Sequence, residues 1–254
     1  MRHAEFEDPR VVAVYNAESP WSHEDDFFVS IIKDFAPIGP DRTPHILDLG
    51  CGTGRLTMGL RNLGYQVTGL DPAKASLNIA RTRPGSDEVT WIEGKSPSLP
   101  NSTFDGALMT SHVAQFFLTD DEWSQTLRDL HRALRPESVL TFDTRDATAR
   151  EWDTWNKAQS TRAIVLPDGQ TVEAWTEVTN ETNELVSFCQ HYIYPDGSEL
   201  LSSATLRFRG LNQIQSSLQV AGFSVEQVYG GWSRQPSGVG DGEFLVVATR
   251  QPDG

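Results

Sequence analysis

The sequence predicts an α/β protein whose core is a doubly wound parallel sheet, interrupted by an inserted antiparallel β layer. Through the first 143 residues, strand-like and helix-like segments alternate, and strands joined by helical crossovers form parallel sheets. Between residues 161 and 209 the helical periodicity is lost, and two Pro-Asp-Gly turns separate runs rich in β-branched and aromatic residues. The α/β pattern returns after residue 210.

Seven segments have the length and residue content of strands in the main sheet. Short apolar runs bounded by turn residues are typical of strands buried on both faces. Five of the segments precede the inserted layer and two follow it. They are residues 46–49, 66–70, 89–93, 104–109, 138–142, 223–229 and 243–249.

Three helices have clear sequence signals. In the helix expected at residues 120–134, Thr119 or Asp120 can cap the start, and we expect Pro136 to end it. The other two are expected at residues 22–35, with Phe27, Phe28, Ile31 and Phe35 on the apolar face, and at residues 211–221, ended by Gly222.

Composition and charge restrict the class of partner. The 254 residues carry a net charge of -14, which repels phosphate backbones and anionic membranes, so we expect no nucleic-acid partner and no membrane partner. No apolar run approaches a membrane span and the start lacks a signal-peptide core, so we expect a cytoplasmic protein. We also expect a monomer or homodimer. Cys51 and Cys189 are too few for a disulfide framework or a cysteine zinc site, and no metal is expected.

The segment HILDLGCGTGRLTMGL places Gly50, Gly52 and Gly54 between a strand and a helix. A Walker loop needs Lys and then Ser or Thr after its last glycine, to reach phosphate and magnesium, but Arg55 stands there. A dinucleotide loop needs a small residue at the same position, so Arg55 also weakens that interpretation. The pattern favours a ligand without a pyrophosphate.

Asp71 supplies a second part of this site. It follows Gly50 by twenty-one residues, close to the roughly 20-residue offset at which a carboxylate accepts hydrogen bonds from ribose hydroxyls. The pairing favours an adenosine-type ligand. In the alternative interpretation the glycines only make a tight turn, and Asp71 caps a helix that starts at Pro72.

Four linked segments carry a more specific pattern. They are ILDLGCGTGRL at 46–56, VTGLDPAKASLNIAR at 67–81, WIEGKSPSLPNSTFDGALMTSHVAQFF at 91–117 and LRDLHRALRPESVLTFDTRD at 127–146. In this order they resemble the class I S-adenosylmethionine-dependent methyltransferases of small-molecule type. The resemblance implies a mostly parallel seven-stranded sheet with an antiparallel last strand, S-adenosylmethionine as cofactor and S-adenosylhomocysteine as product.

The resemblance also implies how the cofactor is held. The methionine part lies over the glycine loop near Asp48, and Asp71 holds the ribose. The family usually has an aspartate where this chain has Lys95, which offers only donors, so we expect Ser96, Glu93, a backbone carbonyl or water to accept from the adenine amino group. The expected cofactor-binding residues are Asp48, Gly50, Cys51, Gly52, Arg55, Asp71, Pro72, Lys95, Ser96, Thr110 and Ser111.

His112 is the candidate general base, because the resemblance places it at the rim of the active site; packing against the cofactor or the following helix is the alternative. Met109-Thr110-Ser111-His112 replaces the Asn/Asp-Pro-Pro-aromatic motif of nucleic-acid amine methylation, which favours a small-molecule acceptor. The aromatic residues expected around the acceptor are Tyr15, Trp21, Phe116, Trp152, Trp155, Trp175, Tyr192 and Trp232.

The expected organisation is a helical lid at residues 1–40, a Rossmann-like core at 41–146 and 210–254, and an inserted helix and antiparallel β cap at 147–209 that forms the acceptor site. We expect methyl transfer to a small molecule by in-line displacement. Two alternatives share the fold: a cofactor-binding protein with a cyclase, isomerase or regulatory role, and a nicotinamide oxidoreductase.

Overall fold

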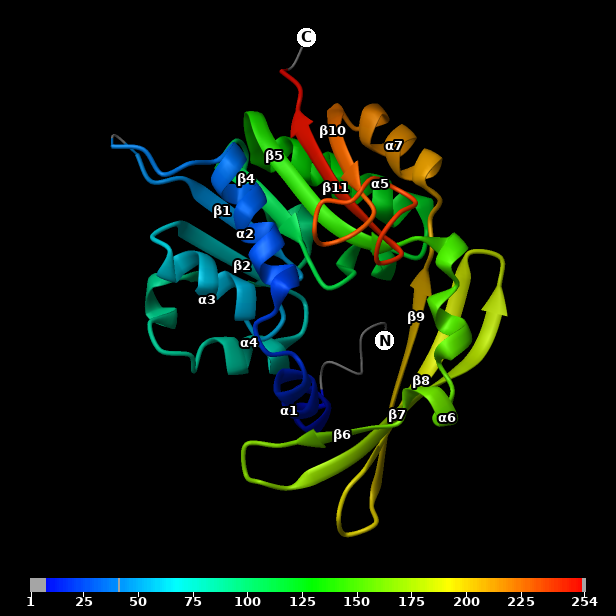
Figure 1. Ribbon diagram of the computed structural model, residues 1–254. Coiled ribbons are helices and arrows are strands. Elements are labelled where there is room, and N and C mark those ends of the chain that lie inside the picture. The colour runs from blue at the N-terminus through cyan, green and yellow to red at the C-terminus, as the bar shows by residue number, and fades with distance from the viewer. Residues whose placement is uncertain (1–7, 41, 253–254) are drawn as a thin grey trace.

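The computed structural model describes residues 8–40 and 42–252, which form two β-sheets (Figure 1). The larger sheet has the strand order β10-β11-β5-β4-β1-β2-β3, and β11 pairs antiparallel with both β5 and β10 while the other pairs are parallel. The predicted fold class is confirmed. Its strands are β1 His45–Leu49, β2 Gln66–Asp71, β3 Thr90–Glu93, β4 Phe104–Met109, β5 Leu134–Arg145, β10 Phe223–Tyr229 and β11 Glu243–Arg250.

Helices cover both faces of the large sheet. On β1, Ile46 packs with α2 and α3, whereas the next residue, Leu47, packs with α5 and α7. Successive strand residues point to opposite faces, so both faces carry apolar side chains and both are buried. The helices are α1 Pro9–Glu18, α2 His23–Phe35, α3 Arg55–Asn62, α4 Lys74–Ala80, α5 Asp120–Ala133, α6 Lys157–Ser160 and α7 Leu211–Val220, with 3-10 helices η2 Ser86–Glu88, η3 Ser96–Ser98, η4 Val113–Phe116, η5 Ala147–Ala149 and η6 Glu151–Thr154.

Two expectations about helix ends are corrected. Thr119 caps α5 as predicted, but the helix ends at Ala133 and Pro136 lies inside β5. The strand begins early because Leu134 already pairs with Phe104 of β4. Phe35, expected on the apolar face of α2, is 41% exposed as the last residue of the helix.

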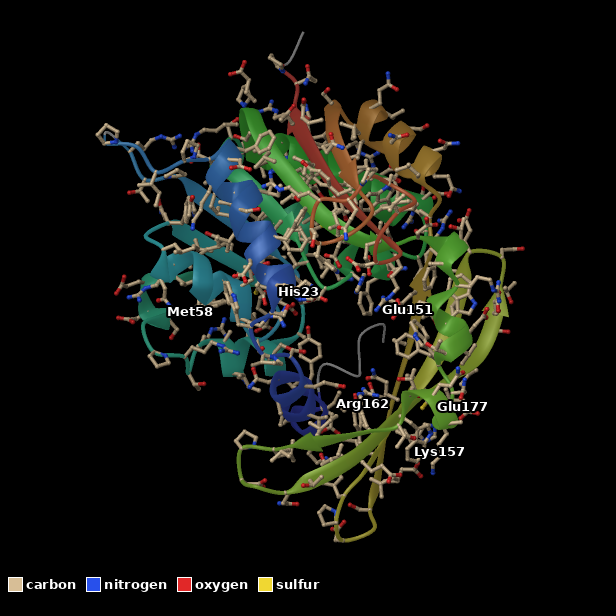
Figure 2. The ribbon with its side chains drawn as sticks, in the orientation of Figure 1. His23, Met58, Glu151, Lys157, Arg162 and Glu177 are labelled. Carbon is tan, nitrogen blue, oxygen red and sulfur yellow. The ribbon has the colours of Figure 1, made fainter. Side chains whose placement is uncertain are left out.

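The smaller sheet is antiparallel and has the order β6-β7-β8-β9. Both Pro-Asp-Gly segments form turns within it, with Gly169 and Gly197 at positive φ. The helix α1 lies between this sheet and the core, where Glu18 forms an ion pair with Arg162 (Figures 1 and 2). The first part of the predicted lid, residues 1–7, lies outside the described residues. The strands are β6 Arg162–Val165, β7 Thr171–Thr182, β8 Leu185–Ile193 and β9 Glu199–Arg207.

Among the described residues no helix is both long enough and apolar enough to cross a bilayer.

Asp105, at the start of β4, joins three segments of the core. Its carboxylate accepts hydrogen bonds from Arg42 at 2.6 and 2.7 Å, from Arg135 at 2.9 Å, and from the backbone N–H of His45 at 2.8 Å. Burial raises the pKa of Asp105, but these donors outweigh burial and leave its pKa below the ordinary value.

We therefore expect Asp105→Asn to lower the free energy of unfolding by about 1–3 kcal/mol at pH 7, because hydrogen bonds to a buried charge are lost. A carboxyl group with a lowered pKa stabilises the fold above its unfolded pKa, so this contribution should begin to shrink as the pH falls below about 4 and be lost as the pH passes through the lower pKa of the folded protein. Urea unfolding at pH 7 and pH 3.5 checks both statements. Asp87→Asn, which removes the same charge at an exposed position, is the control.

Candidate active site

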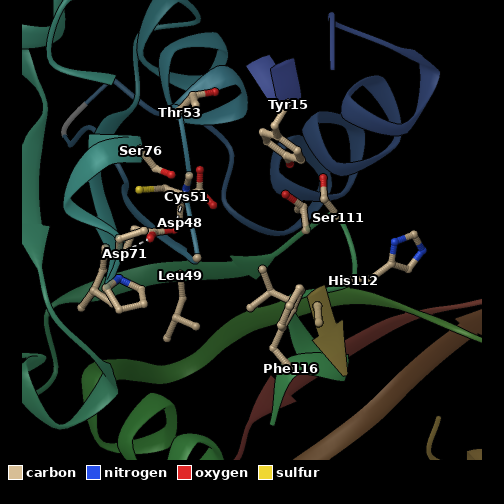
Figure 3. Close-up of a pocket in the computed structure, with 18 of the residues that line it drawn as sticks. Tyr15, Asp48, Leu49, Cys51, Thr53, Asp71, Ser76, Ser111, His112 and Phe116 are labelled. Atoms are coloured by element: carbon tan, nitrogen blue, oxygen red, sulfur yellow. Dashed lines mark hydrogen bonds between the residues drawn. The ribbon is translucent and has the colours of Figure 1, made fainter. Parts of the chain in front are cut away.

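One large cavity, of about 1060 Å³, lies between the glycine loop after β1, the helix α1, and strands β8 and β9 of the smaller sheet. Figure 3 shows the two sides of this cavity, with Asp48, Cys51 and Asp71 on one and Tyr15, His112 and Phe116 on the other. All of the residues expected to bind the cofactor contribute to its wall. Their role in binding stays a prediction.

The three glycines of the loop have positive φ values of 80°, 52° and 77° at Gly50, Gly52 and Gly54. Only glycine adopts this region at little cost. A Cβ on Gly50 would lie 2.5 Å from Val113, and one on Gly54 would lie 2.7 Å from the ring of Trp91. A Cβ on Gly52 would meet nothing within 4 Å, so this glycine presents open backbone to the cavity.

Asp71 ties this loop to the end of β2. Its Oδ2 accepts a hydrogen bond from the backbone N–H of Gly52 at 2.8 Å, and its Oδ1 accepts one from Ala73 at 2.7 Å. The helix α4 begins at Lys74, two residues later than the alternative interpretation expected. Asp71 therefore organises the loop, while its contact with ribose stays a prediction.

Asp48 offers an unpaired oxygen at the cavity. Its Oδ2 accepts from Thr57 Oγ1 at 2.6 Å, and its buried Oδ1 has no donor among the described residues. Burial raises the pKa of Asp48 to about 6, and the nearby Asp71 adds to the effect. A buried carboxylate oxygen without a donor is costly, so this position suits a cationic ligand group. The residues fit a cofactor that carries an ammonium group.

The end of the cavity at which the adenine is expected is formed by η3 and α5. Lys95 is exposed at the rim, whereas Ser96 is buried and donates to Asp129 Oδ2 at 2.9 Å. Glu93 is not part of the cavity wall, which removes it as the substitute acceptor because its exposed side chain lies outside. Gln125 and Thr126 of α5 complete this end. The sequence pattern did not predict a part for Gln125 or Thr126.

The expected aromatic pocket is only partly present. Tyr15, Phe116 and Tyr192 line the cavity as expected, and Phe188 and Gln190 of β8 join them. None of the tryptophans, all of which are described, lines it. The prediction is therefore corrected for Trp21, Trp152, Trp155, Trp175 and Trp232.

Each of these tryptophans has another packing partner. Trp21 covers Gly59 of α3 and donates to Asp26, and Trp232 packs edge-on against Phe27 and Phe28. Trp152 and Trp155 pack with Phe208 behind the cap sheet. Trp175 stacks on His191, with 4.6 Å between the two ring centres. Lys157 Nζ lies 3.9 Å from the centre of the Trp175 ring.

Arg55 connects the cofactor side to the N-terminal segment. Its Nε lies 3.1 Å from Asp25 Oδ1, and its guanidinium donates to the Pro20 carbonyl at 3.1 Å and to Ser111 Oγ at 3.4 Å. A phosphate-binding loop would place a small residue or a lysine here. In this chain the arginine instead holds the entry of α2 against the loop after β4.

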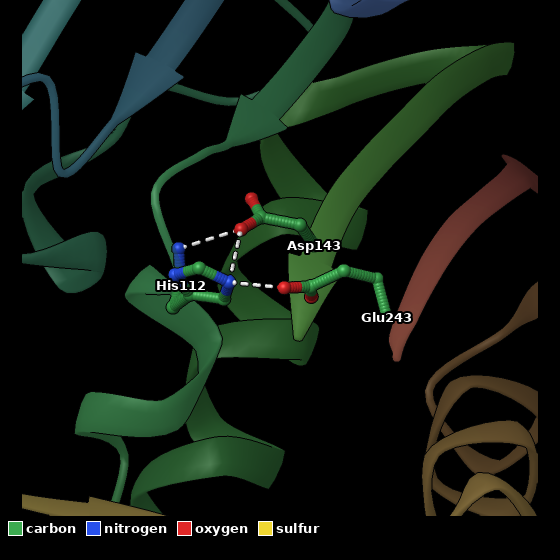
Figure 4. Close-up of side chains that lie close together, drawn as sticks. All are labelled: His112, Asp143 and Glu243. Carbon is green, nitrogen blue, oxygen red and sulfur yellow. Dashed lines mark hydrogen bonds and ion pairs between the residues drawn. The ribbon is translucent and has the colours of Figure 1, made fainter. Parts of the chain in front are cut away.

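His112 belongs to a buried group of titratable side chains (Figure 4). Its Nε2 lies 2.9 Å from Glu243 Oε1 and 3.3 Å from Asp143 Oδ2, and its backbone N–H donates to Asp143 Oδ2 at 2.8 Å. Burial and then Arg145 lower the pKa of His112 to about 4. Burial raises the pKa of Asp143 to about 6 and that of Glu243 to about 8. Both carboxylates were missed from the sequence.

Two substitutions in the glycine loop test how its glycines are packed. Gly50→Ala should lower the free energy of unfolding by about 2–5 kcal/mol, because the left-handed backbone and the clash with Val113 both oppose it. Gly52→Ala meets no neighbour and should cost only about 1–2 kcal/mol from the backbone. Urea denaturation of both variants measures the difference, and equal losses would contradict the described packing.

Comparisons with known proteins place this site in a family. The family model described as Methyltransferase domain matches residues 46–137, which include the glycine loop, Asp71, Ser96 and His112. An uncharacterised methyltransferase of Oceanobacillus iheyensis is 35% identical over 98 residues, which are 38% of this chain and 45% of the relative. The cypemycin N-terminal methyltransferase of Streptomyces sp is 26% identical over 211 residues, which are 81% of this chain and 83% of the relative. The chain spans about half the length of the first two curated relatives that it matches.

Solved structures share the fold across almost the whole chain. The CcbJ methyltransferase of Streptomyces caelestis superposes with a TM-score of 0.77 at 17% identity, covering 98% of both chains. CalS10 of Micromonospora echinaspora, an amino pentose methyltransferase with S-adenosylmethionine bound, gives a TM-score of 0.69 at 22% identity and covers 94% of this chain and 95% of its own. With the matched domain, the strand order and the glycine loop in agreement, residues 46–137 match a methyltransferase domain, and the chain has the fold of the S-adenosylmethionine-dependent methyltransferases to which it is similar.

Proposed function

We propose that the protein transfers a methyl group from S-adenosylmethionine to a small-molecule acceptor and releases S-adenosylhomocysteine. The observation that carries the proposal is that one continuous cavity joins the glycine loop to an aromatic wall made by Tyr15, Phe116 and Tyr192. Its volume of about 1060 Å³ is at the upper limit of the roughly 300–1,000 Å³ of single-ligand pockets, which leaves room for a cofactor and a second molecule.

The division of the wall assigns a role to each side. Asp48 would hold the ammonium group and Asp71 the ribose, while Thr110 and Ser111 lie between the cofactor side and the acceptor side. When bound, S-adenosylmethionine supplies an activated methyl group. The chain then has to align the acceptor with that group and keep water out, for which it provides the aromatic wall and the cap strands.

Several features support a small acceptor. The cap sheet and α1 enclose the aromatic side of the cavity, and one matched structure is described as an amino pentose methyltransferase. The net charge of -14 disfavours nucleic acid and anionic membranes as partners. We extend the proposal to a cytoplasmic monomer or homodimer.

His112 as a general base stays a prediction. The low pKa keeps its ring neutral at pH 7, which is the form that can accept a proton. Its Nε2 faces Asp143 and Glu243, so the other ring nitrogen, Nδ1, would have to serve the acceptor.

The direct test is to incubate the protein with S-adenosylmethionine and a panel of small amines and alcohols, and to quantify S-adenosylhomocysteine by mass spectrometry. We expect product above the acceptor-free rate for at least one class. Tight cofactor binding without product across the panel would favour the non-methylating alternative. Thermal stabilisation by NAD(P) instead of S-adenosylmethionine would favour the oxidoreductase.

The first residue-level prediction concerns Asp71. Asp71→Ala should weaken S-adenosylmethionine binding by about 1–3 kcal/mol, because the ribose partner is lost and Gly52 loses the carboxylate that holds it. Isothermal titration calorimetry measures the change. The control is Glu93→Ala, which also removes one negative charge. Glu93 pairs with Asp71 across β2 and β3 but does not line the cavity, so this variant should leave the affinity unchanged.

The second concerns pH. Asp48 is ionised above its pKa of about 6, and a ligand ammonium with a pKa of about 7.7–8.0 stays cationic below pH 7. Cofactor affinity should therefore fall about tenfold as the pH is lowered from 7 to 5. Asp25 and Asp71 face Asp48 with the same charge and Arg55 with the opposite one. Asp48→Asn should bind more weakly and lose this pH dependence; a dependence that survives in the variant would assign it to another group.

A further inference from the structure

The group formed by His112, Asp143 and Glu243 has the arrangement of a metal site. Each residue offers one ligand atom, and the three atoms lie within 4.8 Å of one another. Figure 4 shows both carboxylates turned toward the same ring nitrogen of His112. The residues come from three segments, namely the loop after β4, the end of β5 and the start of β11.

The distances within the group suit a bound cation. His112 Nε2 lies 2.9 Å from Glu243 Oε1 and 3.3 Å from Asp143 Oδ2. Neighbouring ligands of a zinc ion with bonds of about 2.0–2.1 Å lie roughly 3.0–3.4 Å apart, depending on the coordination geometry. The nitrogen and each of the two oxygens therefore have the spacing of neighbouring ligands, and all three atoms lie within 4.8 Å of one another.

The buried oxygens supply an independent observation. Asp143 is fully buried and Glu243 is 7% exposed, yet Asp143 Oδ1 and Glu243 Oε2 have no hydrogen-bond partner among the described residues. Two buried carboxylates with unpaired oxygens are expensive unless a cation or protons compensate them. The lone pairs that remain can complete the coordination of a metal or hold its water.

Charged side chains of both signs surround the group formed by His112, Asp143 and Glu243. Glu24 and Glu151 act on the group from α2 and η6, and Arg145 is the basic side chain that acts on both His112 and Glu243. Arg145 pairs with Glu151 and donates to Gln115 at 3.0 Å. The Arg145 guanidinium is therefore already engaged by two partners outside the group.

A second group of one histidine and two carboxylates has a geometry that does not suit a single ion. On the outer face of the cap sheet, His191 lies 2.7 Å from Glu199 through Nδ1 and 3.3 Å from Glu177 through Nε2. Opposite ring nitrogens point away from each other, so one ion cannot contact both carboxylates. In the buried group both carboxylates meet the same nitrogen.

We propose that His112, Asp143 and Glu243 bind one divalent transition-metal ion, of the Zn²⁺ class, that fixes the loop carrying Ser111 and His112 to β5 and β11. One imidazole and two carboxylates favour such ions over Mg²⁺ or Ca²⁺, which take oxygen ligands. Ser111 and His112 have positive φ values of 58° and 63°, and both line the cavity. The ion would hold this left-handed turn in place at the wall of the cavity.

The test is calorimetric titration of ZnCl₂ into chelator-stripped full-length protein, followed by variants. We expect one equivalent to bind and to raise the melting temperature. Glu243→Gln keeps the shape of the side chain and His112→Ala removes the nitrogen; each should weaken zinc binding by at least the roughly 10–100-fold seen when a partner of a metal ligand is lost. His191→Ala, in the group on the outer face of the cap sheet, should leave zinc binding unchanged.

Three outcomes would overturn the proposal: no zinc uptake by the unaltered protein, uptake that persists in both buried-group variants, or uptake that is lost in His191→Ala. Circular dichroism and the melting temperature without zinc show whether each variant is folded. If His112→Ala does not fold, the Glu243→Gln protein alone still tests the proposal. S-adenosylmethionine binding and S-adenosylhomocysteine formation are measured separately, so failure of methyl transfer leaves the metal proposal standing. An ion on Nε2 would leave the proton of His112 on Nδ1, so zinc binding would remove His112 as the general base but not the proposed methyl transfer.

Discussion

The geometry of the glycine loop depends on two hydrogen bonds that the Asp71 carboxylate accepts. One of its oxygens holds the Gly52 N–H and the other holds the Ala73 N–H, so the loop after β1 and the end of β2 keep a fixed relation. Gly50 adds a backbone hydrogen bond of 2.7 Å to Leu70 across the same junction. With the loop held in this way, Gly52 stays open to the cavity, and Asp48 keeps one oxygen without a donor from residues 8–40 and 42–252.

The fold could be predicted because its signals are local. Strands such as β4 carry short apolar runs between turn residues, and Thr119 with Glu122 forms the capping box that begins α5. The end of α5 could not be predicted in the same way. Pro136 is compatible with a strand, and the helix ends earlier because Leu134 is drawn into pairing with β4. The pairing of β5 with β4, and not a local sequence signal, therefore sets the end of α5.

The site divides along the same line. The glycine loop and Asp71 are close in sequence to the strands that position them, so their place could be predicted. The tryptophans could not be assigned, because composition does not reveal that Trp175 stacks on His191 on the outer face of the cap sheet or that Trp232 packs on α2. His112 and Glu243 are 131 positions apart and meet only through the antiparallel pairing of β11 with β5. No spacing rule for metal ligands reaches across that distance.

The cap leaves the core once, after β5, and returns once, before α7. Residues 147–209 are therefore a single contiguous piece of chain that supplies Phe188, Gln190 and Tyr192, whereas Asp48, Asp71 and the glycines belong to the core. Changes within that one piece can reshape its part of the cavity wall without disturbing the loop that Asp71 holds, whereas Tyr15 and Phe116 of the same wall lie outside it. The packing of Val113 and Trp91 opposes a side chain at Gly50 or Gly54, so tolerance to substitution should differ between the loop and the cap's part of the cavity wall.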